Sequence, residues 1–270
     1  MSLDLGAYLR RVGFEGRAEA TLPTLERLAR LHPQHIPFEN LDPLLRRPVA
    51  LGLDALQRKL VDERRGGFCY EHNLLFKAAL EAIGFRVTGL AAHVLWGGTD
   101  DTPRPRTHML LKVESDDGPR IVDAGFGGLT LTGVLRLLPH AEQPTPHEPF
   151  RLLEHEGEYT MQAQVGGEWR ALYAFDLQPQ RLPDYELTCW YLCHHPASRF
   201  VNHLLAARTD GERRYGLLDN TLNLHRAGHP SERRRLDSVE ALRDVLVAVF
   251  GLQLPDDPAL DDTLQRIAAR

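Results

Sequence analysis

A cysteine at the start of a predicted helix is the residue best placed for chemistry in this sequence. Cys69 follows Gly66 and Gly67 and opens an amphipathic stretch that ends at Gly84. The N-terminus of a helix presents unpaired backbone N–H groups and the positive end of the helix dipole, and both favour a thiolate over a thiol. Because the thiolate is the nucleophilic form, Cys69 is the candidate nucleophile. The same N–H groups could stabilise an oxyanion.

A nucleophilic cysteine usually works with an imidazole base and a carboxylate that orients the imidazole. His108 and Asp123 lie on successive predicted strands, joined by a short turn at 115–118. If this turn is a two-residue loop, Leu110 faces Asp123 across the hairpin. His108 then becomes a diagonal cross-strand neighbour of Asp123, within side-chain reach. A three-residue loop would put the two side chains on opposite faces.

His72 is the alternative base, because it lies one helical turn after Cys69 and could contact the thiolate. No nearby aspartate is placed to orient His72, and it aligns with the apolar face of the predicted helix. The spacing therefore favours His108 as the base and Asp123 as its orienting carboxylate. Taken singly, His108 could be a half-buried strand histidine, and Asp123 could cap the turn that follows its strand.

A glycine-rich segment follows the candidate carboxylate directly. Gly125, Gly127 and Gly128 surround Phe126, and a glycine-rich turn lets backbone N–H groups approach a phosphate. Many such segments are only tight turns, so the position just after Asp123 is what makes this one a candidate binding loop.

Cys189 and Cys193 raise a zinc interpretation, because His194 and His195 follow them. A structural zinc site usually needs four nitrogen or sulfur ligands at recognisable spacings, and the only other cysteine lies far upstream. Core thiols beside surface histidines are the favoured interpretation, and no metal is expected.

The elements that must position these residues divide the chain into three differently patterned parts. In the first third, apolar residues recur at helical spacing over 5–12, 21–31, 53–60 and 69–83. Short alternating segments separated by turn signals then predict a β-meander or barrel over 86–96, 106–114, 119–124, 150–155, 158–165 and 168–175. The last third combines short strands at 213–218 and 221–225 with a helix near 238–250. The fold class is therefore α+β.

Composition limits the function classes. The chain has 270 residues and a net charge of −5, with 37 acidic against 32 basic residues. No long basic run is present, so nucleic-acid binding is not expected. The first residues lack the apolar core of a signal peptide, and no apolar stretch is long enough to span a membrane. Three cysteines, an odd and sparse set, argue for a reducing compartment, so a cytoplasmic location is expected.

Taken together, the motifs resemble those of the arylamine N-acetyltransferases over nearly the whole chain. The matching motifs lie at 36–41 (IPFENL), 65–73 (RGGFCYEHN), 107–108 (TH), 122–128 (VDAGFGG), 175–177 (FDL), 190–191 (WY) and 195–200 (HPASRF). Chance alone would rarely produce several motifs of this length in the same order. One departure is His72, because the family pattern favours an amide residue there.

The resemblance implies a helical domain over 1–86 that carries the nucleophile, a β-barrel domain over 87–190 and an α/β lid over 191–270. Their Cys-His-Asp core would be like that of cysteine proteases. It also implies a ping-pong reaction with acetyl-CoA as the acyl donor. Cys69 would take the acetyl group, CoA would leave, and an arylamine, arylhydrazine or N-hydroxyarylamine would accept the acetyl group.

Roles for further residues come from the same resemblance. Thr107, Gly127 and Gly128 would lie near the pyrophosphate arm of CoA. Glu39 and Arg65 would form an ion pair that supports the cysteine loop.

An acceptor pocket is implied as well, lined by Phe38, Phe126 and Phe200. Aromatic faces suit an aryl ring. Ordinary core packing is the alternative for each of these three side chains.

Three other functions share these features. A related amide synthase would use the same triad to close a macrolactam on a biosynthetic thioester, and acetylation of a simple aniline would separate the two. A transglutaminase-like or papain-like hydrolase has Cys, His and Asp in this order, but would cleave peptides and ignore acetyl-CoA. A non-catalytic binding module would merely keep the fold, and the intact triad argues against it.

Overall fold

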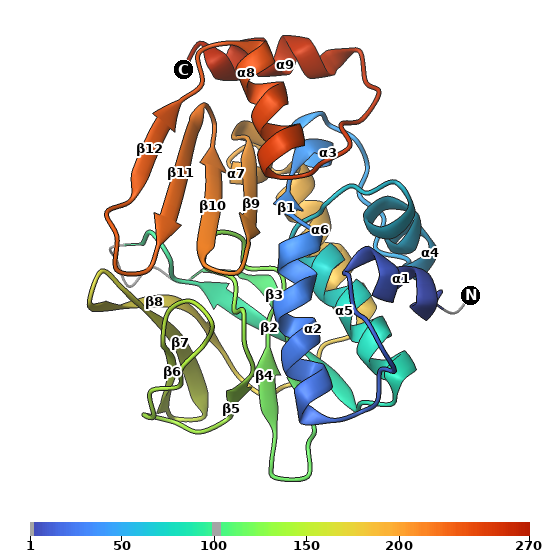
Figure 1. Cartoon of the computed structure of the whole chain (residues 1–270), viewed down its shortest axis with the longest axis vertical. Helices are drawn as coiled ribbons and strands as arrows, with labels where there is room; N and C mark the ends of the chain where they lie inside the picture. Colours follow the sequence, from blue (N-terminus) through green and yellow to red (C-terminus); the bar gives the residue numbers. More distant parts are fainter. Residues whose placement is uncertain (1–2, 99–103) are drawn as a thin grey trace.

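The computed structural model describes residues 3–98 and 104–270, and its α+β architecture confirms the fold class expected from the sequence (Figure 1). Helices form most of the first third. The Asp4 carboxylate accepts a hydrogen bond from the N–H of Ala7 at 2.9 Å and begins the first helix. Gly84, with a φ of 113°, ends the fifth in the left-handed conformation usual for such a cap. The helices are α1 (Leu5–Arg11), α2 (Leu22–His35), α3 (Leu41–Leu44), α4 (Leu53–Leu56), which continues into a π-helical turn (Gln57–Asp62), and α5 (Cys69–Ile83).

The middle of the chain forms one antiparallel seven-stranded sheet in the order β5-β4-β3-β2-β8-β7-β6. Bridges from Pro139 to Leu152 and from Gln143 to Phe150 bring the segment after β5 back to β6, so the sheet is nearly closed and barrel-like. Its strands are β2 (Val87–Val94), β3 (Arg106–Val113), β4 (Arg120–Val122), β5 (Leu135–Arg136), β6 (Phe150–His155), β7 (Glu158–Val165) and β8 (Glu168–Phe175).

The hairpin between β3 and β4 has the register of a two-residue loop. Val113 lies opposite Arg120, and Leu111 lies opposite Val122. This register was the condition for placing His108 and the carboxylate after β4 on one face, and it is confirmed.

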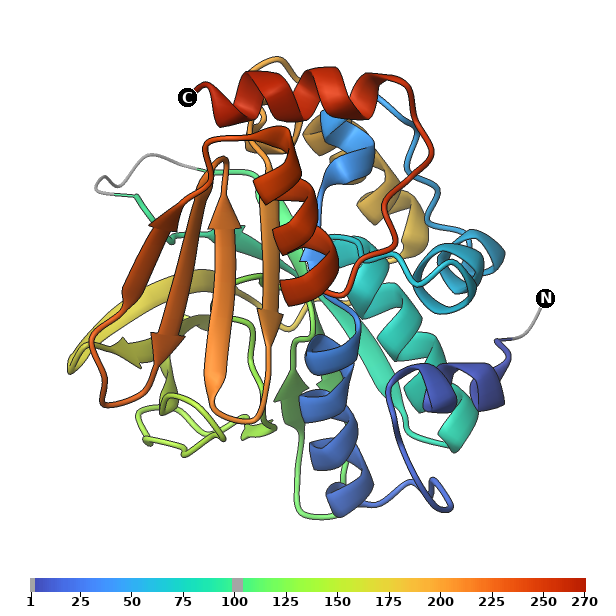
Figure 2. The same ribbon diagram turned by 45° about the horizontal axis from the view of Figure 1, so that its top comes forward.

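A second sheet holds the last third together, in the order β1-β9-β10-β11-β12. Its strands are β1 (Phe38–Glu39), β9 (Leu205–Thr209), β10 (Arg213–Leu218), β11 (Thr221–Arg226) and β12 (Glu232–Arg235). The helical segments α8 (Val239–Asp244), its π-helical continuation (Val245–Val249) and α9 (Ala259–Ala268) pack beside it, with α9 across its end (Figure 2). Because a two-residue strand shows no alternation, the sequence pattern did not predict that β1 joins this sheet.

Two further helices, α6 (Leu182–His194) and α7 (Arg199–Asn202), connect the sheets. Tyr185 and Cys189 of α6 are buried in the same apolar cluster as Cys69 and Tyr70 of α5. Helix α6 therefore spans the expected boundary at 190/191, whereas 86/87 falls between α5 and β2. The division of the chain at these two positions stays a prediction. Within the described part of the chain, no helix combines the length and apolar character needed to cross a membrane.

Candidate active site

Three elements bring the predicted triad together. Cys69 is the first residue of α5, His108 lies on β3, and Asp123 directly follows β4. His108 Nε2 is 2.7 Å from Asp123 Oδ2. The Cys69 sulfur lies close enough to His108 to raise its pKa by hydrogen bonding, and it is 3.6 Å from the carbonyl oxygen of Thr107. All three side chains are buried, so their mutual attraction is little screened by water.

The charges of His108 and Asp123 stabilise one another. Burial alone would lower the pKa of His108, but the charge and hydrogen bond of Asp123, with a smaller effect of Cys69, raise it to about 10. Burial would likewise raise the pKa of Asp123, yet the charge of His108 and hydrogen bonds hold it below its ordinary value. At neutral pH the pair is therefore an imidazolium beside a carboxylate.

Asn73 holds the Asp123 carboxylate in place, a role that the sequence pattern did not predict. Its Nδ2 donates to Asp123 Oδ1 at 3.0 Å and to the carbonyl oxygen of Met109 at 2.7 Å. The N–H of Gly125 donates to the same Oδ1 at 2.9 Å. Because Asn73 lies four residues after Cys69 on one helix, its i, i+4 spacing was the signal that could have found it.

The glycine after the carboxylate has a steric role. A Cβ at Gly125 would lie 2.8 Å from the Cα of Cys69 and 2.9 Å from Nδ2 of Asn73. A side chain would push the strand end away from the helix that carries the nucleophile. Gly125 therefore permits the close approach of β4 and α5.

His72 belongs to a different network. Its Nε2 lies 3.2 Å from the carbonyl oxygen of Pro37, and its Nδ1 lies 3.0 Å from Nε2 of His32. His32 in turn contacts the hydroxyl of Tyr8 at 2.9 Å. Burial lowers the pKa of His72 to about 4. Its partners therefore do not support the alternative in which His72 serves as the base of Cys69.

A buried ion-pair network lies behind the cysteine loop. Arg65 Nη2 is 2.7 Å from Glu39 Oε1 and 3.2 Å from Asp42 Oδ1, so the expected Glu39–Arg65 pair is present. Lys59 Nζ extends the network, at 2.6 Å from both Asp42 Oδ2 and Glu71 Oε1. The Glu71 carboxylate also accepts a hydrogen bond from the N–H of the residue that precedes Cys69, at 3.1 Å. The network thus reaches the first turn of α5.

The three expected pocket phenylalanines are all half-buried, and they form two groups. The rings of Phe38 and Phe200 lie 6.2 Å apart between centroids. The ring of Phe126 lies 5.0 Å from that of His108 and 5.0 Å from that of Tyr173. Tyr173 of β8 was not predicted; burial and the nearby charge of Asp123 raise its pKa well above the ordinary value.

The expected CoA residues flank the triad on the barrel side. Thr107 precedes the base on β3, and its carbonyl oxygen faces the cysteine sulfur. Gly127 has a φ of 82°, which favours glycine, and a Cβ there would lie 3.7 Å from the Phe38 ring. Gly128 is exposed and has open space on its Cβ side.

Cys189 and Cys193 lie in the apolar core with their sulfurs 4.0 Å apart. Over residues 3–98 and 104–270, no group of three or more His, Cys, Asp or Glu side chains could hold a metal ion. Their surroundings fit the interpretation as core thiols.

Comparison with known proteins identifies the family. A family model described as N-acetyltransferase matches residues 21–259. The chain is 46% identical over 260 residues to the arylamine N-acetyltransferase of Mycolicibacterium smegmatis, covering 95% of this chain and 94% of the relative. It is 42% identical over 277 residues to that of Mycobacterium tuberculosis, covering 100% and 98%.

The solved structures agree. The Mycobacterium marinum arylamine N-acetyltransferase in complex with CoA superposes with a TM-score of 0.94 at 38% identity, covering 98% of this chain and 99% of that one. The family model matches most of the chain and the relatives are highly similar, so the chain is an acetyltransferase. The chain belongs to the arylamine N-acetyltransferase family, and the resemblance inferred from its motifs is confirmed.

Proposed function

We propose that this enzyme carries the acetyl group from acetyl-CoA to an arylamine as a thioester on Cys69. The observation that carries the proposal is the buried contact of 2.7 Å between His108 and Asp123, beside the cysteine at the start of α5. Such an arrangement suits a cysteine nucleophile with an oriented imidazole.

In the first half-reaction, the Cys69 thiolate attacks the acetyl carbonyl carbon of acetyl-CoA. The carbonyl oxygen becomes an oxyanion, which backbone N–H groups at the start of α5 can stabilise. The C–S bond to CoA then breaks. The CoA thiolate leaves with the proton of the His108 imidazolium, and the acetyl group remains on Cys69.

In the second half-reaction, the amine nitrogen attacks the thioester carbonyl carbon. Neutral His108 accepts the proton that the nitrogen loses, and the C–S bond to Cys69 breaks. The products are an N-acetylated amine and the Cys69 thiolate beside an imidazolium. Asp123 stabilises that imidazolium and holds its tautomer.

The donor and the acceptor are assigned by chemistry. Thr107, Gly127 and Gly128 would contact the pyrophosphate arm of CoA, and CoA is the ligand of the M. marinum relative's solved structure. The half-buried rings of Phe38, Phe126 and Phe200 would receive the aryl ring of an arylamine, arylhydrazine or N-hydroxyarylamine. Glu39 and Arg65 would hold the cysteine loop in place.

Mass spectrometry of the covalent intermediate tests the proposal. Mixing the protein with acetyl-CoA alone should add one acetyl group to the peptide that contains Cys69, and an arylamine should then remove it. Cys69→Ser should form little adduct, because a hydroxyl has a far higher pKa than a thiol. An acetyl group on Cys189 or Cys193, or ternary-complex kinetics, would overturn the mechanism.

The same assay separates the alternative functions. A macrolactam synthase would not transfer acetyl to a simple aniline, and a papain-like hydrolase would cleave peptides without an acetyl-enzyme. The expected outcome is that N-acetylaniline forms only after the acetyl-enzyme has accumulated.

A further inference from the structure

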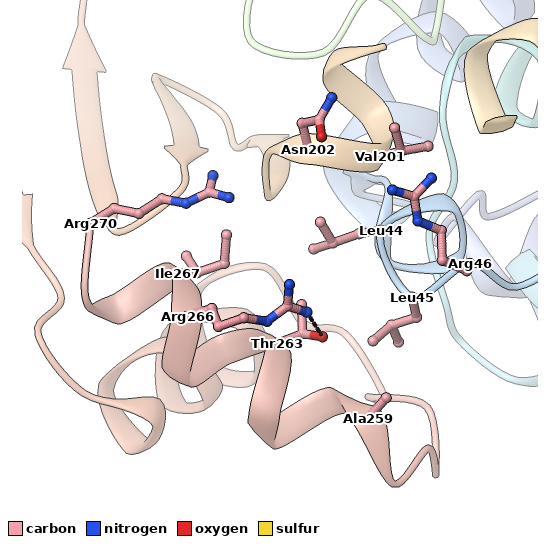
Figure 3. Close-up of a pocket in the computed structure, with 10 residues that line it drawn as sticks. All are labelled: Leu44, Leu45, Arg46, Val201, Asn202, Ala259, Thr263, Arg266, Ile267 and Arg270. Atoms are coloured by element: carbon pink, nitrogen blue, oxygen red, sulfur yellow. Dashed lines mark hydrogen bonds between the residues drawn. The ribbon is translucent and has the colours of Figure 1, made fainter. Parts of the chain in front are cut away.

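A pocket of about 250 Å³ lies between α3, α7 and α9 (Figure 3). None of the triad residues lines it, and neither do the glycine loop or the three phenylalanines of the acceptor site. It is therefore separate from the site described above.

The lining combines an apolar floor with cationic groups. Leu44 and Ile267 are buried and face the cavity from α3 and α9. Arg46, Arg266 and Arg270 are exposed and line the same cavity. Figure 3 shows Arg266 on α9 and Arg270 just beyond the end of that helix, both beside Ile267. A guanidinium is planar and matches a carboxylate with two parallel hydrogen bonds.

Two of the three guanidinium charges have no carboxylate partner among the described residues. Arg270 Nη1 lies 2.7 Å from Asp219 Oδ1 and is neutralised. Arg266 donates only to the neutral Thr263 hydroxyl, at 2.9 Å. No ion pair within 3–98 and 104–270 involves Arg46, whereas the next residue, Arg47, contacts two aspartates.

Helix dipoles explain only part of this arrangement. A helix C-terminus favours cations, which accounts for Arg266 in the last turn of α9. Arg46 instead follows α3 with a φ of 60°, a conformation that suits glycine. Arg46 therefore lies beside the pocket directly after the C-cap of α3, with its side chain exposed.

We propose that this pocket binds a small organic carboxylate with an apolar body of about one ring. Arg46 and Arg266 would hold the carboxylate, and Leu44 and Ile267 would contact the body. The cavity volume of about 250 Å³ lies below the range of about 300–1,000 Å³ that is common for sites of drug-sized ligands, so a ligand of about one ring is the size expected here.

Occupancy of this pocket is coupled to the acceptor site, a step that rests on the proposed function. Val201 and Asn202 of α7 line the pocket, and Phe200 precedes them on the same helix. The Asn40 amide, at the start of α3, donates to the carbonyl oxygen of Phe200 at 2.8 Å and to that of His203 at 2.7 Å. A ligand that contacts both α3 and α7 should shift Phe200 and change the KM of the arylamine.

Calorimetric titration at low ionic strength tests the binding. Cyclohexanecarboxylate is the probe, because it lacks an aromatic ring for the acceptor site; its neutral carboxamide is the matched control. The carboxylate should bind saturably, and about tenfold or more tightly than the carboxamide. The double variant Arg46→Gly/Arg266→Gln should bind it about 10- to 100-fold more weakly, since charge-assisted hydrogen bonds are lost.

Two features of these variants distinguish a loss of binding from a failure to fold. Arg46→Gly suits the left-handed backbone, and Arg235→Gln, at an exposed arginine paired with Asp237 outside the pocket, should bind like the wild type. Equal affinity for carboxylate and carboxamide, unchanged affinity in the double variant, or equally tight binding of inorganic phosphate would each overturn the proposal.

Binding and coupling are measured separately from the proposed chemistry. Cys69→Ala cannot form a thioester but should bind the probe unchanged, so failure of the acetyl-enzyme assay leaves the pocket testable. In the wild type, saturating carboxylate should change the arylamine KM at least threefold and leave the rate of acetyl-enzyme formation unchanged. The same KM shift in the double variant would overturn the coupling.

Discussion

Arg214 of β10 and Glu148 of the loop before β6 form a buried ion pair, with Nη2 2.6 Å from Oε2. Arg214 also donates a hydrogen bond to the carbonyl oxygen of Thr130 at 3.0 Å. The Thr130 hydroxyl in turn donates to the carbonyl oxygen of Asp123 at 3.0 Å. The pair therefore ties the second sheet to the segment that holds the candidate carboxylate.

Removing one partner of this pair should destabilise the protein. Glu148→Gln leaves the Arg214 charge buried without a counterion, which should lower the free energy of unfolding by about 3–5 kcal/mol. Urea denaturation measures this loss. Asp237→Asn, which breaks the exposed pair with Arg235, is the control and should cost less than about 1 kcal/mol. Similar losses for the two variants would show that the buried pair contributes little.

Asp123→Asn tests the orienting carboxylate. The amide cannot stabilise the His108 imidazolium or hold its tautomer, so turnover should fall about 10²-fold or more while the circular dichroism spectrum stays unchanged. Steady-state kinetics with acetyl-CoA and an arylamine measure the loss. Activity within a few-fold of wild type would reduce Asp123 to a structural role.

Gly125→Ala and Gly128→Ala form a matched pair. The methyl group at Gly125 would lie 2.8 Å from the Cα of Cys69, whereas that at Gly128 meets no atom within 4 Å. Displacing the nucleophile by about 1 Å can cost about 10²-fold in rate, so Gly125→Ala should slow acetyl-enzyme formation by about that factor. Gly128→Ala should keep the wild-type melting temperature. Equal acetylation rates for wild type and Gly125→Ala would contradict the close-approach argument.

The buried His72 should make the protein less stable in acid. Its pKa of about 4 lies below the value of about 6.5 expected in the unfolded chain. Between these values the unfolded chain binds more protons, so stability falls as the pH drops from about 6.5 toward 4. His72→Gln removes this protonation and should reduce the loss by roughly 3 kcal/mol.

Urea denaturation at pH 7, 5.5 and 4.5 measures the effect of His72→Gln. Burial also lowers the pKa of His32, so protonation of His32 makes the protein less stable in acid as well. His72→Gln should therefore reduce the pH dependence of stability without abolishing it. His195→Gln, at an exposed histidine, is the control. Parallel profiles for wild type and His72→Gln would show that His72 does not titrate as described.

Local sequence patterns predicted most of the fold. Helical spacing after Cys69 predicted α5, and alternation with turn residues predicted the strands of the barrel-like sheet. The turn at 115–118 predicted a hairpin but left two registers open, and the structure has the one that brings His108 and Asp123 onto one face. These features follow from dihedral preferences and apolar periodicity over a few residues, and the ordered motifs were enough to indicate the family.

Only the tertiary structure decided which partner each buried polar group has. Asn73 was on a predicted helix, but its contact with Asp123 joins residues 50 positions apart. His72 was an alternative base until its contacts with Pro37 and His32 turned it into a separate network. A buried polar group must find a hydrogen-bonding partner, and the distance along the chain does not restrict where that partner lies. Spacing within one element therefore could not predict these contacts.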